Sequence, residues 1–266
     1  MLRRSLPLAL ALVSSAAGCN RATQPEGPAK AEASAPAEPR PDGPIHKATT
    51  QLVVIETDDW AANRGQLRRY SRTSSGWQAD GPELPVVIGR TGLAWGLGLH
   101  GEPPTKEPIK REGDGKSPAG IFRIGAGFGY ANTAPEGTKL DYRKLLETDR
   151  CVDDPKSEHY NRIVDQATLT NDWSSAEIMR RSDELYRWVI LIDHNGIRGG
   201  EARPGSGSCI FFHVWSGPAN PTVGCAAMEV NQLEELMRWL DPGADPAVVM
   251  LPRSVYQRQR ESWSLP

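Results

Sequence analysis

The feature that most limits how this chain can fold is a series of short apolar, β-branched runs separated by turn residues. Such runs are typical of strands, because a helix needs a longer segment with a 3.6-residue period. The apolar runs lie at residues 51–57, 84–88, 121–124, 188–193, 208–215 and 247–251, and residues 65–71 form a further strand candidate in which apolar and polar residues alternate. Many short strands with few helices predict a mostly β domain, a sandwich or barrel with a few short helices.

Helical patterns are limited to two segments. Residues 230–240 have the period of an amphipathic helix. Its apolar face consists of Val230, Leu233, Leu236, Met237 and Leu240. A second, shorter helix is expected at residues 175–182. These two segments do not alternate with the strands as the helices of a parallel α/β sheet do, so the prediction remains mostly β.

The first 19 residues have the pattern of a bacterial export signal. Arg3 and Arg4 precede an apolar run at residues 6–13, which is too short to span a bilayer comfortably. The sequence AAGC, ending at Cys19, resembles the lipobox at which a lipoprotein cysteine is lipidated. We therefore expect an exported, periplasmic protein anchored to a membrane through Cys19. Asn20, in place of the Asp of an inner-membrane retention signal, favours the outer membrane. An ordinary cleaved secretory signal is the alternative.

Residues 20–48 are rich in Ala, Pro and Glu and have almost no large apolar side chains. Such a segment cannot bury enough surface to offset the entropy of ordering it, so we expect a disordered tether. Fully extended, it would reach about 90–100 Å. Residues 49–266 then form one folded domain, because no second linker interrupts them.

Composition and motifs argue against several classes of function. A formal net charge of −2 provides no basic field for nucleic acid. The five histidines show no pair at metal-ligand spacing and no C-x-x-C occurs, so no metal site is predicted. The glycines at 96, 98 and 101 match G-x-G-x-x-G, but prolines follow where the phosphate-binding helix should begin. No cofactor is expected.

The cysteine count leaves one thiol without a partner. If Cys19 carries lipid, then Cys151, Cys209 and Cys225 are left in an oxidising compartment, and an odd number cannot all pair within the chain. Our hypothesis is a disulfide bond between Cys151 and Cys209, which leaves Cys225 free. The alternative is that Cys151 and Cys209 are both buried thiols.

A histidine and a cysteine joined by one loop form the candidate catalytic pair. His213 ends an apolar run, and Cys225 follows Gly224 after a Gly/Pro-rich loop. An imidazole beside a thiol lowers the pKa of the thiol and activates it as a nucleophile. Gly224 leaves room for a substrate carbonyl, and the backbone N–H groups of Gly224 and Cys225 are candidate oxyanion donors. The helix from about Val230 would add its positive end. The alternative is a buried structural thiol.

Several segments resemble the L,D-transpeptidases of the YkuD type. The first is IFFHVWSGPANPTVGCAAM at residues 210–228, which is similar to the active-site segment of the family. KREGDGKSPAGIF, at residues 110–122, resembles the motif that precedes a strand beside the substrate cleft. The opening strands, QLVVIETDDW and PVVIGRTGLAWGLGLH, are also similar. Residues 151–165 and 172–195 resemble an insertion found in one branch of exported members.

This resemblance implies a mostly β catalytic domain that acts on peptidoglycan stem peptides. Cys225 would be the nucleophile that forms a thioester with the stem peptide, and His213 the general base and then the acid. An amine of another stem or of a protein would accept the acyl group. Candidate substrate-binding residues are Thr222 and Trp215. Val223 stands where the family often has a histidine. Two alternatives remain open: a hydrolase acting on the same substrates, and a non-catalytic wall-binding lipoprotein.

Overall fold

The computed structural model describes residues 43–102, 104 and 106–266. The expected export signal, the lipidation site at Cys19 and most of the expected tether lie outside the described residues. Helices long and apolar enough to cross a membrane are absent from the described part of the chain.

The domain is built mainly from strands. The first seven are β1 (Gln51–Thr57), β2 (Arg64–Thr73), β3 (Gly76–Ala79), β4 (Leu84–Val87), β5 (Leu93–Trp95), β6 (Ser117–Gly129) and β7 (Tyr142–Lys144). The other seven are β8 (Asp149–Val152), β9 (Ile163–Asp165), β10 (Ala176–Ile178), β11 (Trp188–Ile192), β12 (Phe211–Val214), β13 (Ala226–Met228) and β14 (Ala247–Pro252). The helices are α1 (Val230–Trp239) and α2 (Arg253–Gln259), with short 3₁₀ turns at Gln166–Thr168 and Pro242–Ala244.

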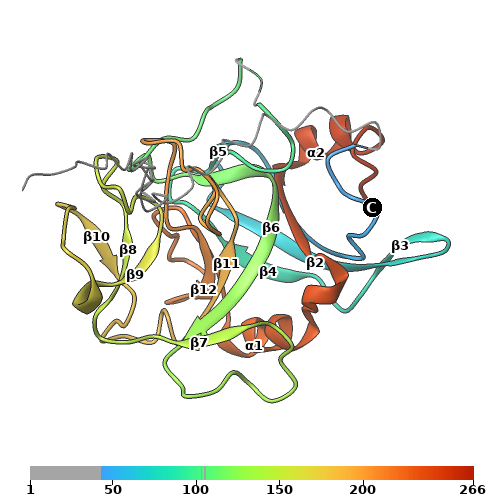
Figure 1. The fold of residues 1–266 in the computed structure, drawn as a ribbon. Helices are drawn as coiled ribbons and strands as arrows, with labels where there is room; N and C mark the ends of the chain where they lie inside the picture. The colour runs from blue at the N-terminus through green and yellow to red at the C-terminus, as the bar shows by residue number, and fades with distance from the viewer. Residues whose placement is uncertain (1–42, 103, 105) are drawn as a thin grey trace, which may run out of the picture. The chain divides into compact units, whose positions relative to one another are not determined.

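The larger sheet closes on itself to form a barrel. Its strands follow the order β1-β14-β6-β11-β12-β13-β4-β2, and β2 pairs with β1 to complete the ring. The long, curved strand β6 runs through the middle of the molecule (Figure 1) and also carries β5 and β7. Closure removes free strand edges from the sheet. The architecture confirms the predicted mostly β fold and identifies it as a barrel with additional strands.

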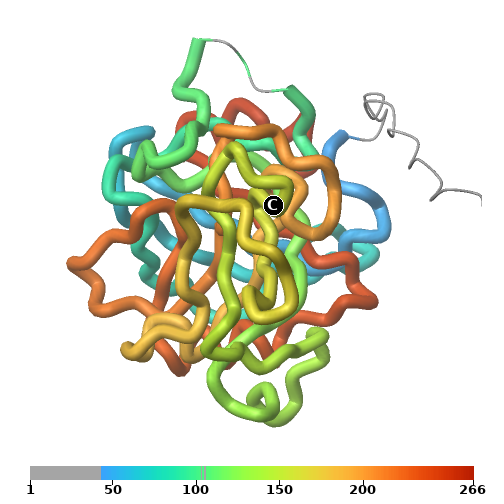
Figure 2. Tube along the Cα trace, turned by 60° about the vertical axis from the view of Figure 1, so that its left-hand side comes forward, coloured from blue at the N-terminus to red at the C-terminus, as the bar shows by residue number. Residues whose placement is uncertain are grey.

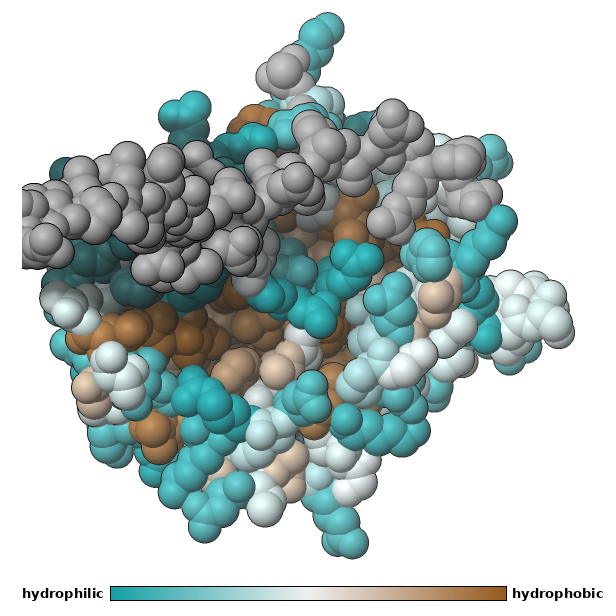
Figure 3. All heavy atoms as spheres, in the orientation of Figure 1, coloured by the Kyte–Doolittle hydropathy of each residue, from teal (hydrophilic) through white to brown (hydrophobic). Residues whose placement is uncertain are grey.

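The core fills the barrel and extends beneath α1. Strand residues such as Ile55, Phe122 and Phe212 are completely buried. In α1, Leu233 and Leu236 are also fully buried, and the helix packs against β11 and β12. The apolar face predicted for residues 230–240 is therefore confirmed. Hydrophobic residues form a band across the face shown in Figure 3, bordered by hydrophilic side chains.

Strands β8, β9 and β10 form a separate small sheet within the insertion predicted between the barrel strands. Figure 2 shows this segment, in yellow-green and yellow, lying in front of the barrel strands. The predicted helix at residues 175–182 was wrong, because β10 lies there and pairs antiparallel with β8. Local composition suggested a helix, but pairing with β8, distant in sequence, determines the conformation.

The predicted strands are confirmed with small changes of length. Residues 51–57 match β1 in full, and residues 247–251 match β14 to within one residue. The strand predicted at residues 208–215 is shorter in the structure, where β12 covers Phe211–Val214. It begins later because Cys209 has a left-handed backbone with a φ of 56°. The run at residues 121–124 is the centre of the much longer β6.

Candidate active site

The two candidate catalytic residues lie on neighbouring strands. Strands β12 and β13 pair in parallel, with His213 opposite Ala227. Cys225 lies two residues before Ala227, so its side chain and that of His213 face the same side of the sheet. The offset along the strands and the spacing between them place the two Cα atoms roughly 8 Å apart. The sequence prediction that the loop brings this pair together agrees with the register.

The thiol occupies a buried position beside the disulfide bond. Cys225 is 3% exposed, and its Sγ donates a hydrogen bond to the carbonyl oxygen of Cys209 at 3.3 Å. Cys209 itself is bonded to Cys151, which leaves Cys225 as the free cysteine of the described residues. This is the pairing expected from the sequence. The disulfide therefore attaches the insertion to the segment that contacts Cys225.

Two hydroxyl groups fix the backbone at Cys225. The carbonyl oxygen of Cys225 accepts hydrogen bonds from Thr222 Oγ1 at 2.6 Å and from Ser117 Oγ at 3.1 Å. Ser117 Oγ also accepts a bond from Gly89 N–H. Ser117 lies in the motif at residues 110–122 that the sequence related to the substrate cleft. Its contribution is to join β6 to the loop that carries Cys225.

The candidate oxyanion donors differ in their availability. The Gly224 N–H donates to Thr222 Oγ1 at 3.1 Å, so it is already engaged in the loop. The Cys225 N–H makes no loop or turn hydrogen bond with the described residues. Gly224 also permits a close approach, because a Cβ at this position would lie 3.3 Å from the Lys116 carbonyl oxygen. The Cys225 N–H is therefore the better placed of the two to receive an oxyanion.

The imidazole of His213 is held in one orientation. Its Nδ1 lies 2.8 Å from the carbonyl oxygen of Val214, which can only accept, so Nδ1 carries the proton. Nε2 is then the basic nitrogen. The ring of Tyr186 packs edge-on against the imidazole, with centroids 5.2 Å apart. A backbone carbonyl thus supplies the orienting contact that sequence alone could not assign.

Burial keeps both groups neutral in the resting site. Loss of hydration raises the pKa of the Cys225 thiol far above its usual value, and the Glu177 carboxylate raises it further. Burial also lowers the pKa of His213 to about 4. No hydrogen bond joins the two side chains in the described part of the chain. The thiolate–imidazolium pair expected from the sequence is therefore not the favoured resting state, because desolvation disfavours both charges.

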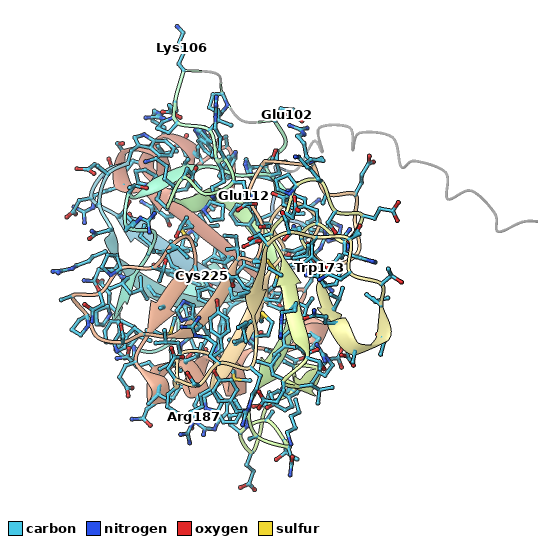
Figure 4. The ribbon with its side chains drawn as sticks, turned by 90° about the vertical axis from the view of Figure 1, so that its left-hand side faces the viewer. Glu102, Lys106, Glu112, Trp173, Arg187 and Cys225 are labelled. Carbon is cyan, nitrogen blue, oxygen red and sulfur yellow. A yellow bond between two sulfur atoms is a disulfide. The ribbon has the colours of Figure 1, made fainter. Side chains whose placement is uncertain are left out.

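A cavity of about 220 Å³ opens onto the thiol. Figure 4 shows Cys225 in the middle of the domain, with Glu112 above it. Charged residues from four parts of the chain line the cavity, namely Arg90, Lys110, Glu112, Asp153 and Glu177. Neither Trp215 nor Thr222, the two predicted substrate-binding residues, is among the cavity-lining residues of the described chain.

The two cationic side chains that line the cavity, Lys110 and Arg90, differ in whether their charge is already paired. Lys110 Nζ is nearly buried and donates to Asp114 Oδ1 at 2.6 Å and to the Arg111 carbonyl oxygen at 2.7 Å. Its charge is therefore largely balanced by Asp114. Arg90 is exposed, and its guanidinium forms no ion pair with the described residues. Arg90 is the cavity cation available to a substrate carboxylate.

The positive end of α1 does not act on the thiol. Glu229 caps the helix by accepting hydrogen bonds from the N–H groups of Asn231 and Gln232, so a carboxylate already occupies that end. Strand β13 also separates Cys225 from the helix, and the effect of a helix end falls off within about one turn. The contribution expected from Val230 onward is therefore absent.

Sequence reasoning missed the acidic side of the cavity. Asp153 follows β8 and Glu177 lies in β10, so both belong to the insertion. Their approach to Cys225 depends on pairing between segments far apart in the chain, which local periodicity does not reveal. The only sequence signal was indirect, since Asp153 follows closely after the disulfide cysteine Cys151. Groups of His, Cys, Asp or Glu that could hold a metal ion are absent from the described residues.

A comparison with known families finds a match over most of the domain. Residues 50–249 match the family model YkuD, described as the L,D-transpeptidase catalytic domain. Neither the curated proteins nor the solved structures gave a match. The match covers most of the chain and includes seven barrel strands in full, the first half of β14, His213 and Cys225. This chain therefore belongs to the YkuD family of L,D-transpeptidase catalytic domains.

Proposed function

We propose that this protein is a cysteine-dependent L,D-transpeptidase that acts on peptidoglycan stem peptides through a thioester intermediate. The observation that carries the proposal is a free thiol, Cys225, at the base of a charged cavity in a domain of this family. His213, on the same side of the adjacent strand, supplies a basic Nε2. A nucleophile, a base and an accessible cavity are the components that acyl transfer requires.

The resting geometry defines how the first step begins. Because thiol and imidazole are both neutral, Cys225 loses its proton to His213 Nε2 as Sγ attacks the substrate carbonyl, rather than beforehand. Catalytic pairs are often loosely arranged without substrate and tighten when it binds. The oxyanion that forms would accept a hydrogen bond from the Cys225 N–H. Arg90 would hold a carboxylate of the stem peptide at the mouth of the cavity.

The test is incubation of the purified full-length protein with a tetrapeptide muropeptide, followed by mass spectrometry of the products. We expect a cross-linked dimer and release of the terminal D-alanine. Loss of D-alanine without a dimer would instead assign a hydrolase. An unchanged muropeptide, with no acyl-enzyme in the intact mass, would contradict catalysis and favour a wall-binding role.

We also propose that the protein works outside the cytoplasm, in the periplasm, held to a membrane, with the outer membrane favoured, by lipid on Cys19. The support is the signal-like segment at residues 1–19 and the Cys151–Cys209 disulfide, since such bonds persist mainly in oxidising compartments. Cells grown with labelled palmitate should yield labelled protein, whereas the Cys19→Ala variant should be unlabelled. An unlabelled parent protein would refute the lipid anchor.

A further inference from the structure

A carboxyl group and a phenol lie beside the thiol, and the catalytic pair does not account for them. The hydroxyl of Tyr186, a residue only 6% exposed, donates to Glu177 Oε2 at 2.8 Å. The same ring packs edge-on against His213, with centroids 5.2 Å apart, and Tyr186 lies close enough to Cys225 that a charge on the thiol would raise the pKa of the phenol. Tyr186 therefore contacts both His213 and Glu177, and it lies near the thiol.

Glu177 lines the cavity and uses one of its two carboxyl oxygens, Oε2, to accept from Tyr186. Oε1 accepts no hydrogen bond from the described residues, and Glu177 lines the same 220 Å³ cavity as Cys225. Asp153 lines this cavity as well, and its buried Oδ1 has no hydrogen-bond partner among the described residues. Two ionised carboxylates this close to a thiol destabilise the folded state unless one of them is protonated or a hydrogen-bond donor lies between them.

Glu177 lines the cavity that holds the thiol, whereas His213 is not among the lining residues of the described chain, so Glu177 is the group exposed to an amine bound there. Acyl transfer from a peptide expels an amine, which must gain a proton as its bond to carbon breaks. Acyl transfer to a new amine requires the opposite, loss of a proton as the new bond forms. His213 could serve both transfers, but a second acid–base group in the cavity would let the imidazole keep the Cys225 proton and return it to the sulfur at the end of the cycle.

We propose that Glu177, positioned by Tyr186 beside Asp153, is the acid–base residue that serves the amine groups of the reaction. The inference rests on the proposed acyl-transfer function and adds a residue to it. It also gives the insertion a role in catalysis, since β10 delivers Glu177 to the cavity.

The protons and bonds balance over the cycle. In the first half, Cys225 Sγ forms a bond to the carbonyl carbon and its proton passes to His213. The carbon–nitrogen bond breaks, and the leaving amine takes a proton from the Glu177 carboxyl. In the second half, the acceptor amine forms the new carbon–nitrogen bond and gives its proton to Glu177. The carbon–sulfur bond breaks, and Cys225 recovers its proton from His213.

The environment of Glu177 suits this exchange. Burial raises its pKa to about 7, although the hydrogen bond from Tyr186 works in the opposite direction. The other ionisable groups that act on it are Asp153, Arg181, Glu112 and Cys225. Cys151, opposite Glu177 in β8, is disulfide-bonded and does not titrate. A group that gains and loses a proton near neutral pH can act as both acid and base.

The decisive experiment compares two acyl donors that carry the same acyl group but different leaving groups. One donor is an amide and the other is an aryl thioester. The aryl thiolate leaves without needing a proton. In Glu177→Gln, which keeps an oxygen to accept from Tyr186, we expect acylation by the amide to fall about 100-fold. Acylation by the aryl thioester should change by no more than a few fold. Single-turnover acylation followed by intact mass measures both rates.

The pH profile provides an independent readout. Acylation by the amide needs protonated Glu177, so its rate in the parent protein should fall as pH rises through about 7. This fall should be missing from Glu177→Gln and from the aryl thioester reaction of the parent. Tyr186→Phe should move the midpoint, because it removes the hydrogen bond to Glu177.

Matched controls separate chemistry from structure. Glu102→Gln makes the same kind of substitution at a solvent-exposed position, where Glu102 pairs with Arg203. It should leave both acylation rates unchanged. If Glu177→Gln keeps the amide rate, or loses both rates equally, the acid–base role is overturned. The proposed function would still stand in either case, provided that the parent protein transfers the acyl group.

Discussion

Replacing Cys225 by alanine is expected to abolish acyl transfer and the acyl-enzyme together. The other cysteines of the described domain, Cys151 and Cys209, are joined in a disulfide and offer no substitute nucleophile. Loss of the nucleophile in covalent catalysis removes at least about 10⁴-fold of the rate. Turnover of the tetrapeptide muropeptide and the intact mass of the protein after incubation measure the two effects.

The fold should survive this substitution. Cys225 makes one weak sulfur hydrogen bond, and alanine removes one buried sulfur atom, so the expected loss of stability is about 1 kcal/mol. Circular dichroism and urea unfolding of the variant check this. Retained turnover in a folded Cys225→Ala protein would rule out Cys225 as the nucleophile. A folded, inactive variant that still shows a covalent acyl adduct would point to another acceptor.

Most of the barrel was predictable because seven of its eight strands carry a local signal, whereas β13 was not among the predicted strands. Runs of apolar and β-branched residues, such as residues 51–57 and 247–251, were recognisable without partners. Closure of the sheet was not, since it depends on β2 pairing with β1 as well as with β4. Hydrophobic pattern specifies which residues are strands and which face is buried, but the order of strands depends on pairings distant in sequence.

The proximity of the candidate catalytic pair, His213 and Cys225, was predictable for a similar reason. One short loop joins His213 to Cys225, so their proximity follows from sequence spacing. Their ionisation did not follow, because spacing carries no information on burial. A sequence containing both residues suggests an ion pair, whereas the enclosed site favours the neutral forms. The charged wall of the cavity was also hidden, since Glu177 reaches it through β10, a strand that local composition presented as a helix.

Removal of the disulfide bond is expected to have the largest effect on stability. The bond joins residues 58 positions apart, and closing a loop of that length restricts the unfolded chain by about 4 kcal/mol. The double variant Cys151→Ala/Cys209→Ala should therefore lose a comparable free energy of unfolding. For a domain of this size the melting temperature should fall by roughly 10 °C. Urea unfolding and thermal melting under the same conditions measure both values.

The position of the bond predicts how catalysis should respond to its loss. Cys151 lies opposite Glu177 in the β8–β10 pair, and the Cys209 carbonyl contacts the Cys225 sulfur. Without the bond, the small sheet that carries Asp153 and Glu177 is less firmly held against the cavity. Below its melting temperature, the double variant should lose more activity toward the amide donor than toward the aryl thioester.

Cys225→Ala, which leaves the disulfide intact, is the matched control for stability. A double variant as stable as the parent would show that the barrel alone sets the stability. Equal losses toward both donors would show that the bond positions the nucleophile rather than Glu177.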